Sequence, residues 1–219
     1  VQGRAAWRDA RTVAALSASD LAIDGYRQWS DARLQRTTLA VDRALDVATT
    51  LELRLHAARD PQARNPGALT VAEWSARADS AAPNNLRRRA DKRVDQQQLS
   101  LRLRREGTNG ARVEASVFGL RRDLDNPLAT PPPGSTAPDV GTEVTIRRGV
   151  GGARLAASWP LAPRFVVSGG AEWQTMRDHR TNARTTGGAR RLPTDTLLLD
   201  QIERVTNVAP FAQLAWTPD

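Results

Sequence analysis

Apolar and polar residues alternate along several stretches of the chain. Between Val47 and Ala57 the odd-numbered positions are apolar or small, and most even-numbered positions are polar or charged. A period of two residues places successive side chains on opposite faces of a β-strand. The same alternation returns at residues 98–104, 112–117, 143–147 and 153–159. The chain is therefore predicted to be mostly β, with two-faced strands.

The alternation and the turn residues between its stretches predict eight antiparallel strands. They are expected at residues 3–17, 26–43, 46–58, 93–106, 110–123, 142–159, 164–180 and 196–217. The pair Asn109-Gly110 predicts a tight turn, because both residues tolerate a positive φ. Within the sixth strand the apolar positions change from even to odd numbers around Gly149–Gly152. This change predicts a β-bulge, because one extra residue would restore the register of the two faces.

The connections between the predicted strands alternate between short and long. Short connections are expected at residues 43–46, 106–110 and 160–163, and long ones at 17–25, 59–93, 124–141 and 181–195. The longest contains Thr70-Val-Ala-Glu73, a capping-box sequence that predicts a short helix. Long loops are uncommon in compact soluble domains. Short turns at one end and long loops at the other are typical of an outer-membrane β-barrel.

Alternation alone does not separate a soluble sandwich from a membrane barrel. In a sandwich the apolar face packs inward, whereas in a membrane barrel it meets lipid and the polar face lines a wet lumen. Ionised side chains such as Glu52 and Arg54 follow one another on the polar face, as a lumen permits. Trp159, Phe165 and Trp216 fall beside the short turns, as in an interfacial aromatic girdle. Both observations favour the barrel.

Composition removes several function classes. The 219 residues include no cysteine, which excludes disulfides, thiolate metal sites and cysteine nucleophiles. The chain contains no apolar run of about 18 residues, so no transmembrane helix is predicted. A nucleophile turn G-x-S-x-G and a phosphate-binding loop are both absent. The chain is predicted not to be an enzyme, and its net charge of +8 suits a polyanionic partner.

Three groups of residues resemble segments of TonB-dependent outer-membrane receptors of the ferric-siderophore type. They are Asp24-Gly-Tyr-Arg27 with Ser30, Asn65-Pro-Gly-Ala-Leu-Thr70 with Ala82-Pro-Asn-Asn85, and Phe211-Ala-Gln213 with Trp216. In that family such segments open an early barrel strand, form an extracellular loop and precede a periplasmic turn. The resemblance spans almost the whole chain.

The resemblance implies an up-and-down transmembrane barrel of about 22 strands, of which residues 1–219 would form a partial segment of about eight. The plug domain and the remaining strands would be absent. It also implies the outer membrane of a Gram-negative-type bacterium and import of a ferric siderophore or similar scarce chelate, energised through TonB. Lipid and lipopolysaccharide are further expected partners. Iron would be carried by the ligand, with no cofactor, no protein-coordinated metal and no nucleic acid.

Ligand contacts are expected from the loops at residues 59–93, 124–141 and 181–195, because an aromatic surface beside cations suits an anionic, ring-bearing chelate. The candidate residues are Trp74, Arg87, Arg88, His179 and Arg180. Two alternatives share the pattern. A soluble Arg-rich β domain could bind nucleic acid or another polyanion through the basic cluster at residues 86–93, although it would need a basic stripe with exposed aromatics on one face. A passive porin-like barrel would have the same fold.

Overall fold

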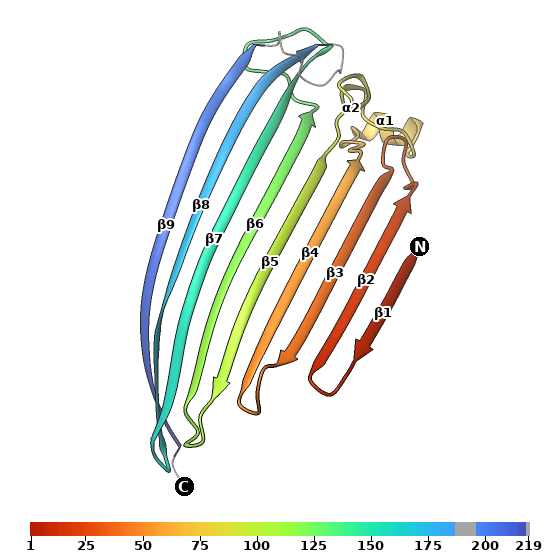
Figure 1. Ribbon diagram of the computed structural model, residues 1–219. Helices are drawn as coiled ribbons and strands as arrows, with labels where there is room; N and C mark the ends of the chain where they lie inside the picture. Colours follow the sequence, from red (N-terminus) through yellow and green to blue (C-terminus); the bar gives the residue numbers. More distant parts are fainter. Residues whose placement is uncertain (187–195, 218–219) are drawn as a thin grey trace.

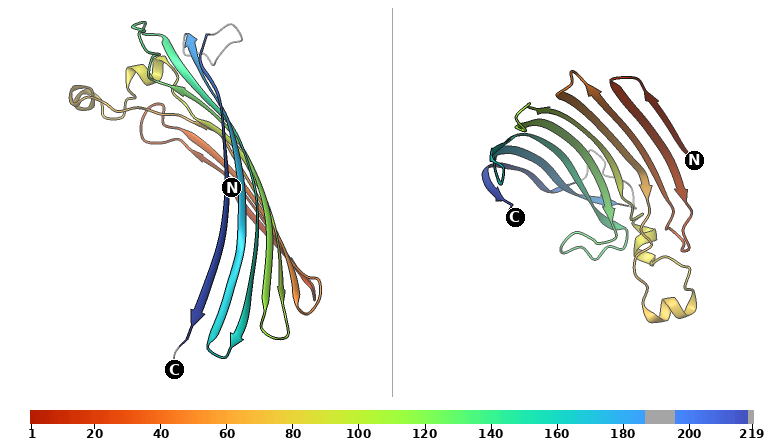
Figure 2. Two further views of the ribbon diagram at one scale, coloured as in Figure 1. Left: turned by 90° about the vertical axis from the view of Figure 1, so that its left-hand side faces the viewer. Right: turned by 90° about the horizontal axis from the view of Figure 1, so that it is seen from below.

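The computed structural model describes residues 1–186 and 196–217, in which nine strands form one antiparallel sheet (Figure 1). Each strand pairs with the next along the chain. The strands are β1 (Gln2–Arg8), β2 (Thr12–Ile23), β3 (Ala32–Ala44), β4 (Thr49–Ala63), β5 (Arg93–Glu106), β6 (Arg112–Leu128), β7 (Val140–Ala162), β8 (Phe165–Thr186) and β9 (Leu197–Trp216). The sheet is a curved, open trough with β1 and β9 at its edges (Figure 2). The prediction of an up-and-down all-β sheet is confirmed.

The predicted count of eight strands is wrong by one, because the strand expected at residues 3–17 is a hairpin. The Asp9 carboxylate accepts hydrogen bonds from the N–H groups of Arg11 at 2.7 Å and Thr12 at 2.6 Å. An aspartate that bonds the backbone two or three residues later forms a turn of its own. Residues 4–17 contain no glycine or proline, so the sequence shows no break between β1 and β2.

The cross-strand register separates two faces of the sheet. One row on the first face, called the apolar face below, consists of Val41, Leu53, Leu101, Val117, Ala153, Trp173 and Val208. The neighbouring row on the other face, called the charged face, consists of Asp42, Glu52, Arg102, Ser116, Arg154, Glu172 and Ala209. The apolar face is open to its surroundings, with Leu155 57% and Val208 64% exposed. A soluble sandwich buries such a face, whereas a membrane barrel presents it to lipid.

The predicted bulge at Gly149–Gly152 is wrong. The register of β7 with both β6 and β8 runs through this stretch without a shift. The apolar parity changes for a different reason: Val144 and Ile146 lie on the charged face, near the loop end. There Ile146 pairs with Leu124, beyond the stretch in which apolar and charged side chains alternate.

The glycines of β7 and β8 have a packing role instead. A Cβ atom added to Gly152 would lie 2.5 Å from Cε1 of Phe118, its cross-strand partner. A Cβ on Gly170 would lie 2.7 Å from Cζ of Phe211, which is again its partner. A glycine within a strand often marks such a close approach. On the charged face, the rings of Phe118 and Phe211 therefore occupy the space above Gly152 and Gly170.

Several strands are longer at the loop end than the alternation predicted. β4 continues to Ala63, β6 to Leu128 and β8 to Thr186, instead of ending at residues 58, 123 and 180. These extensions carry polar residues on both faces, so they lack the apolar alternation of a lipid-facing strand. Backbone pairing nevertheless continues through them. Part of the loop predicted at residues 181–195 is thus strand, and residues 187–195 lie outside the described residues.

Long connections and short turns lie at opposite ends of the sheet, as predicted (Figure 1). The connection between β4 and β5 holds two short helices, α1 (Val71–Ala76) and α2 (Pro83–Arg87). Among the described residues, no helix is long and apolar enough to span a membrane. At the short-turn end the rings of Phe165 and Trp216 stack with centroids 6.5 Å apart. Their position beside these turns agrees with the predicted girdle.

Candidate binding site at the loop end

Two connections at the long-loop end are tied into one unit, called the loop platform. It consists of residues 24–31 between β2 and β3 and residues 64–92 between β4 and β5. The Arg27 guanidinium crosses between them, because its Nε donates to the Ser80 carbonyl at 2.9 Å and its Nη1 to the Gly67 carbonyl at 2.7 Å. One arginine from the first connection therefore organises both halves of the second.

A second tie is built around Trp29. Its indole N–H donates to the Ala90 carbonyl at 2.7 Å, and the Arg64 guanidinium lies 4.1 Å from the ring centroid. Arg64 also pairs with Asp31 at 3.0 Å. The φ angle of Trp29 is +60°, which is uncommon for a bulky residue. These contacts hold the backbone in that conformation and fix the platform to the sheet.

The helix α1 begins with the predicted capping box. The Thr70 hydroxyl accepts from the Glu73 N–H at 3.2 Å, and the Thr70 N–H donates to the Glu73 carboxylate at 2.8 Å. These two bonds satisfy N–H groups that the first turn of a helix leaves open. The Trp74 N–H then bonds the Thr70 carbonyl at 2.9 Å. The cap therefore positions Trp74.

A cleft of about 380 Å³ opens beside this helix. It is lined by Tyr26, Arg27, Leu69, Thr70, Val71, Trp74 and Ala78, so both connections contribute to it. Tyr26 is 80%, Val71 83% and Trp74 62% exposed. Exposed aromatic and aliphatic side chains beside a cleft of this size are typical of a small-molecule site. The sequence motif contained Tyr26 but did not indicate that it would face Trp74 across a cleft.

The basic cluster at residues 86–93 is not one surface. Arg87 is exposed in α2, whereas Arg88 is only 7% exposed and its guanidinium donates to the Ala129 carbonyl. Arg88 thus links the platform to the connection between β6 and β7. Arg93 pairs with Asp91 at 3.3 Å. A ligand-binding role of Arg87 and Arg88 stays a prediction, with Arg87 the one that faces solvent.

The structure places His179 and Arg180 in β8, apart from the helices of the platform (Figure 1). His179 is on the apolar-face side, with its Nε2 2.6 Å from Oδ1 of Asp200, and Arg180 points to the opposite side. These two residues are therefore not gathered with Trp74. Within residues 1–186 and 196–217, no group of histidine, aspartate and glutamate side chains is arranged to hold a metal ion.

Acidic and basic side chains interlock on the charged face. Arg102 lies 3.5 Å from both Glu52 and Glu114, and Arg104 lies 3.7 Å from the same two carboxylates. The positive charge of β5 is therefore matched by its neighbours. The nucleic-acid alternative needs a basic stripe with exposed aromatics, and this part of the sheet does not supply one.

The sequence matches no protein-family model and no curated protein, but solved structures share its fold. The unliganded ferric citrate transporter FecA aligns over 98% of this chain with a TM-score of 0.83 and 15% identity. The copper transporter OprC aligns over 97% with a TM-score of 0.68 and 18% identity. The chain has the fold of a barrel segment of TonB-dependent receptors, with its sheet open at both edges.

The two solved chains are much longer than this one. The chain spans about a third of these two solved chains, 32% of FecA and 31% of OprC. Both are transporters rather than enzymes. At such low identity the match establishes the fold, so the ligand has to be argued from the residues of the loop platform.

The cap of α1 is open to a direct test. The pKa of Glu73 lies below its ordinary value of 4.5, because the N–H and hydroxyl of Thr70 both donate to its carboxylate. The stabilisation that the Glu73 carboxylate gives to the helix is thus complete at a pH above 4.5. It is lost as the pH falls through the lowered pKa of Glu73.

We expect Thr70→Ala to cost the helix about 1 kcal/mol. Hydrogen exchange of residues 71–77 should then accelerate about fivefold, which is the same free energy expressed as a rate. Glu73→Gln should remove the dependence of this exchange on acidic pH. Thr108→Ala, in an exposed turn at the other end of the sheet, is the control. Unchanged exchange in Thr70→Ala would contradict the role of the cap.

Proposed function

We propose that the chain is part of an outer-membrane active transporter that binds a ferric siderophore or similar chelate at the loop platform and imports it with energy from TonB. The membrane is that of a Gram-negative-type bacterium. The observation that carries the proposal is the cleft between Tyr26 and Trp74, which lies on the long-loop end of a receptor-barrel fold. That end faces the exterior in outer-membrane barrels.

The chemistry of the cleft suits an anionic ligand with rings. Tyr26 and Trp74 offer two aromatic surfaces for stacking. Arg27 lines the same cleft, and N–H groups of its guanidinium already donate to the carbonyls of Ser80 and Gly67. Arg27 therefore contributes positive charge more than free donors, so it attracts an anion without fixing one geometry. Exposed Arg87 adds charge at the rim of the platform.

Removing either aromatic ring should weaken ligand capture. We expect Trp74→Ala and Tyr26→Ala each to raise the Kd for a ferric chelate about tenfold, or about 1.4 kcal/mol, because each removes a stacking surface. Binding is measured in the cold on cells that express the full-length receptor, with a labelled panel of ferric chelates, free copper and short peptides. Val71→Ser should weaken binding as well, whereas Val47→Ser, at a fully exposed valine that does not line the cleft, should not.

The panel also separates the parts of the proposal. If free copper or short peptides bind through Trp74 and no ferric chelate does, the site stands and the ligand class is overturned. Accumulation at 37 °C should stop in cells without TonB or with an uncoupler, while binding in the cold persists. Accumulation that continues without TonB would instead identify a passive, porin-like barrel.

A further inference from the structure

Arg87 and Arg88 are neighbours in the sequence but have opposite surroundings. Arg87 is exposed on α2, whereas Arg88 is only 7% exposed. The Arg88 guanidinium donates to the carbonyl of Ala129, where the connection between β6 and β7 begins. A Cβ atom added to Gly141, where this connection ends, would lie 3.6 Å from Cδ of Arg88. Arg88 therefore reaches both ends of the connection, at the loop end of the sheet (Figure 1).

Residues 129–139 form this connection and are called the proline strap below. They include four prolines, and a segment rich in proline is stiff because each ring fixes φ. A turn around Gly134, whose φ is +79°, is closed by the Ser135 N–H, which donates to the Pro132 carbonyl at 3.1 Å. A segment of this kind moves as one piece about its two ends, and Arg88 is placed at those ends.

The tie between Arg88 and the proline strap is incomplete. The Nε atom of Arg88 is buried and has no hydrogen-bond partner among the described residues. The partner of the guanidinium is a neutral carbonyl rather than a carboxylate, although buried charges are normally paired. Of the hydrogen bonds between described residues, the bond to Ala129 is the one that joins the loop platform to the proline strap. A tie built in this way is suited to opening and closing.

The helix α2 is linked to the cleft between Tyr26 and Trp74. The Ala82 N–H, at the start of α2, donates to the Pro66 carbonyl at 2.7 Å. The carbonyl of the next residue, Gly67, is held by Arg27, which lines the cleft. A ligand that orders the cleft therefore also orders α2, and with it the residue that holds the proline strap.

We propose that Arg88 couples ligand capture at the cleft to the position of the proline strap. A bound chelate favours the closed tie, in which the proline strap is docked on the loop platform, and the docked strap slows the departure of the chelate. Arg88 is a positioning residue in this role. Arg87 acts differently, because an exposed charge at the rim speeds the approach of an anion. The inference rests on the proposed function and adds the regulation of the same site.

Coupling between two sites is reciprocal. The factor by which a bound chelate slows hydrogen exchange in the proline strap therefore equals the factor by which loss of the tie weakens chelate binding. We expect both to be about tenfold, the smaller end of the range for a hydrogen bond with one charged partner. Loss of the Arg88 tie should change the dissociation rate. Loss of the Arg87 charge should change the association rate and its dependence on salt.

The test uses the full-length receptor purified in detergent, with iron(III) tris-catecholate, an anionic chelate built from aromatic rings, as the probe. Hydrogen exchange at Ser135 and Val140 reports on the proline strap, and stopped-flow fluorescence gives the rates of binding. Bound chelate should slow this exchange about tenfold in the wild type and leave it unchanged in Arg88→Met. Arg88→Met should also raise the dissociation rate about tenfold. Arg88→Lys, which keeps a charged donor, should restore most of the loss.

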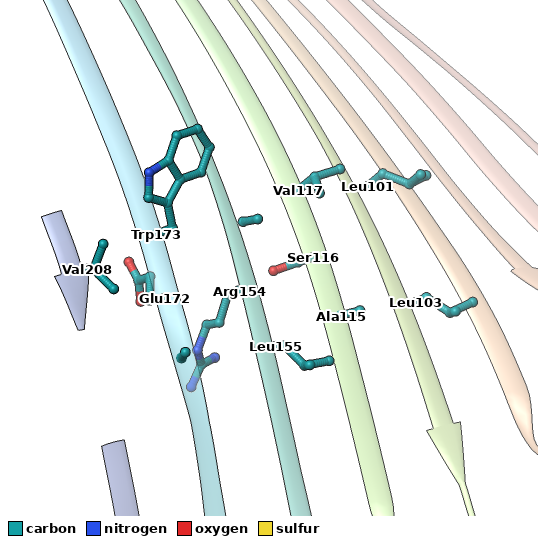
Figure 3. A pocket seen from close by; sticks show the side chains of 12 residues that line it. Leu101, Leu103, Ala115, Ser116, Val117, Arg154, Leu155, Glu172, Trp173 and Val208 are labelled. Carbon is teal, nitrogen blue, oxygen red and sulfur yellow. The ribbon is translucent and has the colours of Figure 1, made fainter. Parts of the chain in front are cut away.

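Two controls separate coupling from general loosening. Arg87→Met should slow association at low salt and leave the dissociation rate and the exchange of the proline strap unchanged. Leu155→Ala enlarges the apolar groove of about 460 Å³ on the apolar face, away from the loops (Figure 3), and should change none of these quantities. Arg88→Met should not lower the Tm, because methionine keeps much of the buried volume and removes a buried charge.

Equal dissociation rates in the wild type and Arg88→Met would overturn the coupling, as would a bound chelate that leaves the exchange of the proline strap unchanged. A lower Tm of Arg88→Met with wild-type dissociation would show a purely structural tie. Without any chelate, Arg88→Met should already accelerate exchange at Ser135 and Val140, and unchanged exchange would overturn the tie itself. This arm needs no ligand, so a failure of the tie and a failure of chelate binding through Trp74 give different results.

Discussion

Leu101→Arg should prevent assembly of the barrel, whereas Ser100→Arg should leave it intact. Leu101 lies on the apolar face between Leu53 and Val117. Its row lies four residues from the cross-strand row of Arg121, Gly149, Arg177 and Arg204 (the arginine row) and six to eight residues from the aromatic residues at the short turns. An arginine on the lipid side at the bilayer midplane costs about 2–4 kcal/mol. Ser100 is one residue away on the charged face, opposite Arg54, where the same new side chain meets a wet lumen.

The comparison uses the full-length receptor in cells, scored by its shift on heating in gel electrophoresis and by surface labelling of the loop platform. Leu53→Arg should behave as Leu101→Arg does. Arg102→Leu, which removes a charge from the opposite face, should still assemble. Equal damage from Ser100→Arg and Leu101→Arg would contradict the assignment of the two faces.

Gly170→Ala should have an effect of similar size for a different reason. A Cβ atom at Gly170 would lie 2.2 Å from the Leu155 carbonyl oxygen and 2.9 Å from Cα of Ala156. Both atoms belong to the backbone of β7, so no side-chain rotation relieves the clash and the strands must separate. Phe211, whose ring also occupies this space, would be displaced at the same time. We expect the free energy of unfolding to fall by several kcal/mol, in the range of severe core overpacking.

Gly151→Ala is the control for this substitution, because its Cβ would meet only the Phe118 carbonyl oxygen at an ordinary 3.9 Å. Unfolding of the purified receptor in guanidinium, followed by tryptophan fluorescence, measures both variants. Adding Phe211→Ala to Gly170→Ala should not restore stability, since the nearest clash is with backbone. A stable Gly170→Ala variant would show that the strands have room to move apart.

Much of the sheet could be predicted from the sequence because apolar and charged residues alternate along its strands with a period of two. Leu53 and Glu52 identify their faces by residue type alone, and the register confirms them. The hairpin at Asp9 was missed because a side-chain turn needs neither glycine nor proline. The ends of β4, β6 and β8 were missed because these strand ends carry polar residues on both faces. The alternation that identifies a two-faced strand is therefore absent there.

The binding site was predicted less well because long-range contacts build it. Trp74 and its helix could be predicted from a local signal, the capping box that begins at Thr70. The position of Tyr26 beside it depends on Arg27 bonding carbonyls 40 and 53 residues away, which no local pattern encodes. For the same reason Arg88 looked like a surface cation in the sequence and is a buried link between loops.

In the proposed outer-membrane transporter, the distance between the girdle and the arginine row would set the membrane thickness that suits the protein. Trp159 and Gly149 mark these two levels on β7, about ten residues or 33 Å apart along the strand. With a strand tilt of about 40°, this corresponds to a hydrophobic thickness of about 25 Å, several ångströms less than that of an average bilayer. Reconstituted in long-chain lipids, the receptor would be hydrophobically mismatched, and short-chain lipids should give the more stable preparation.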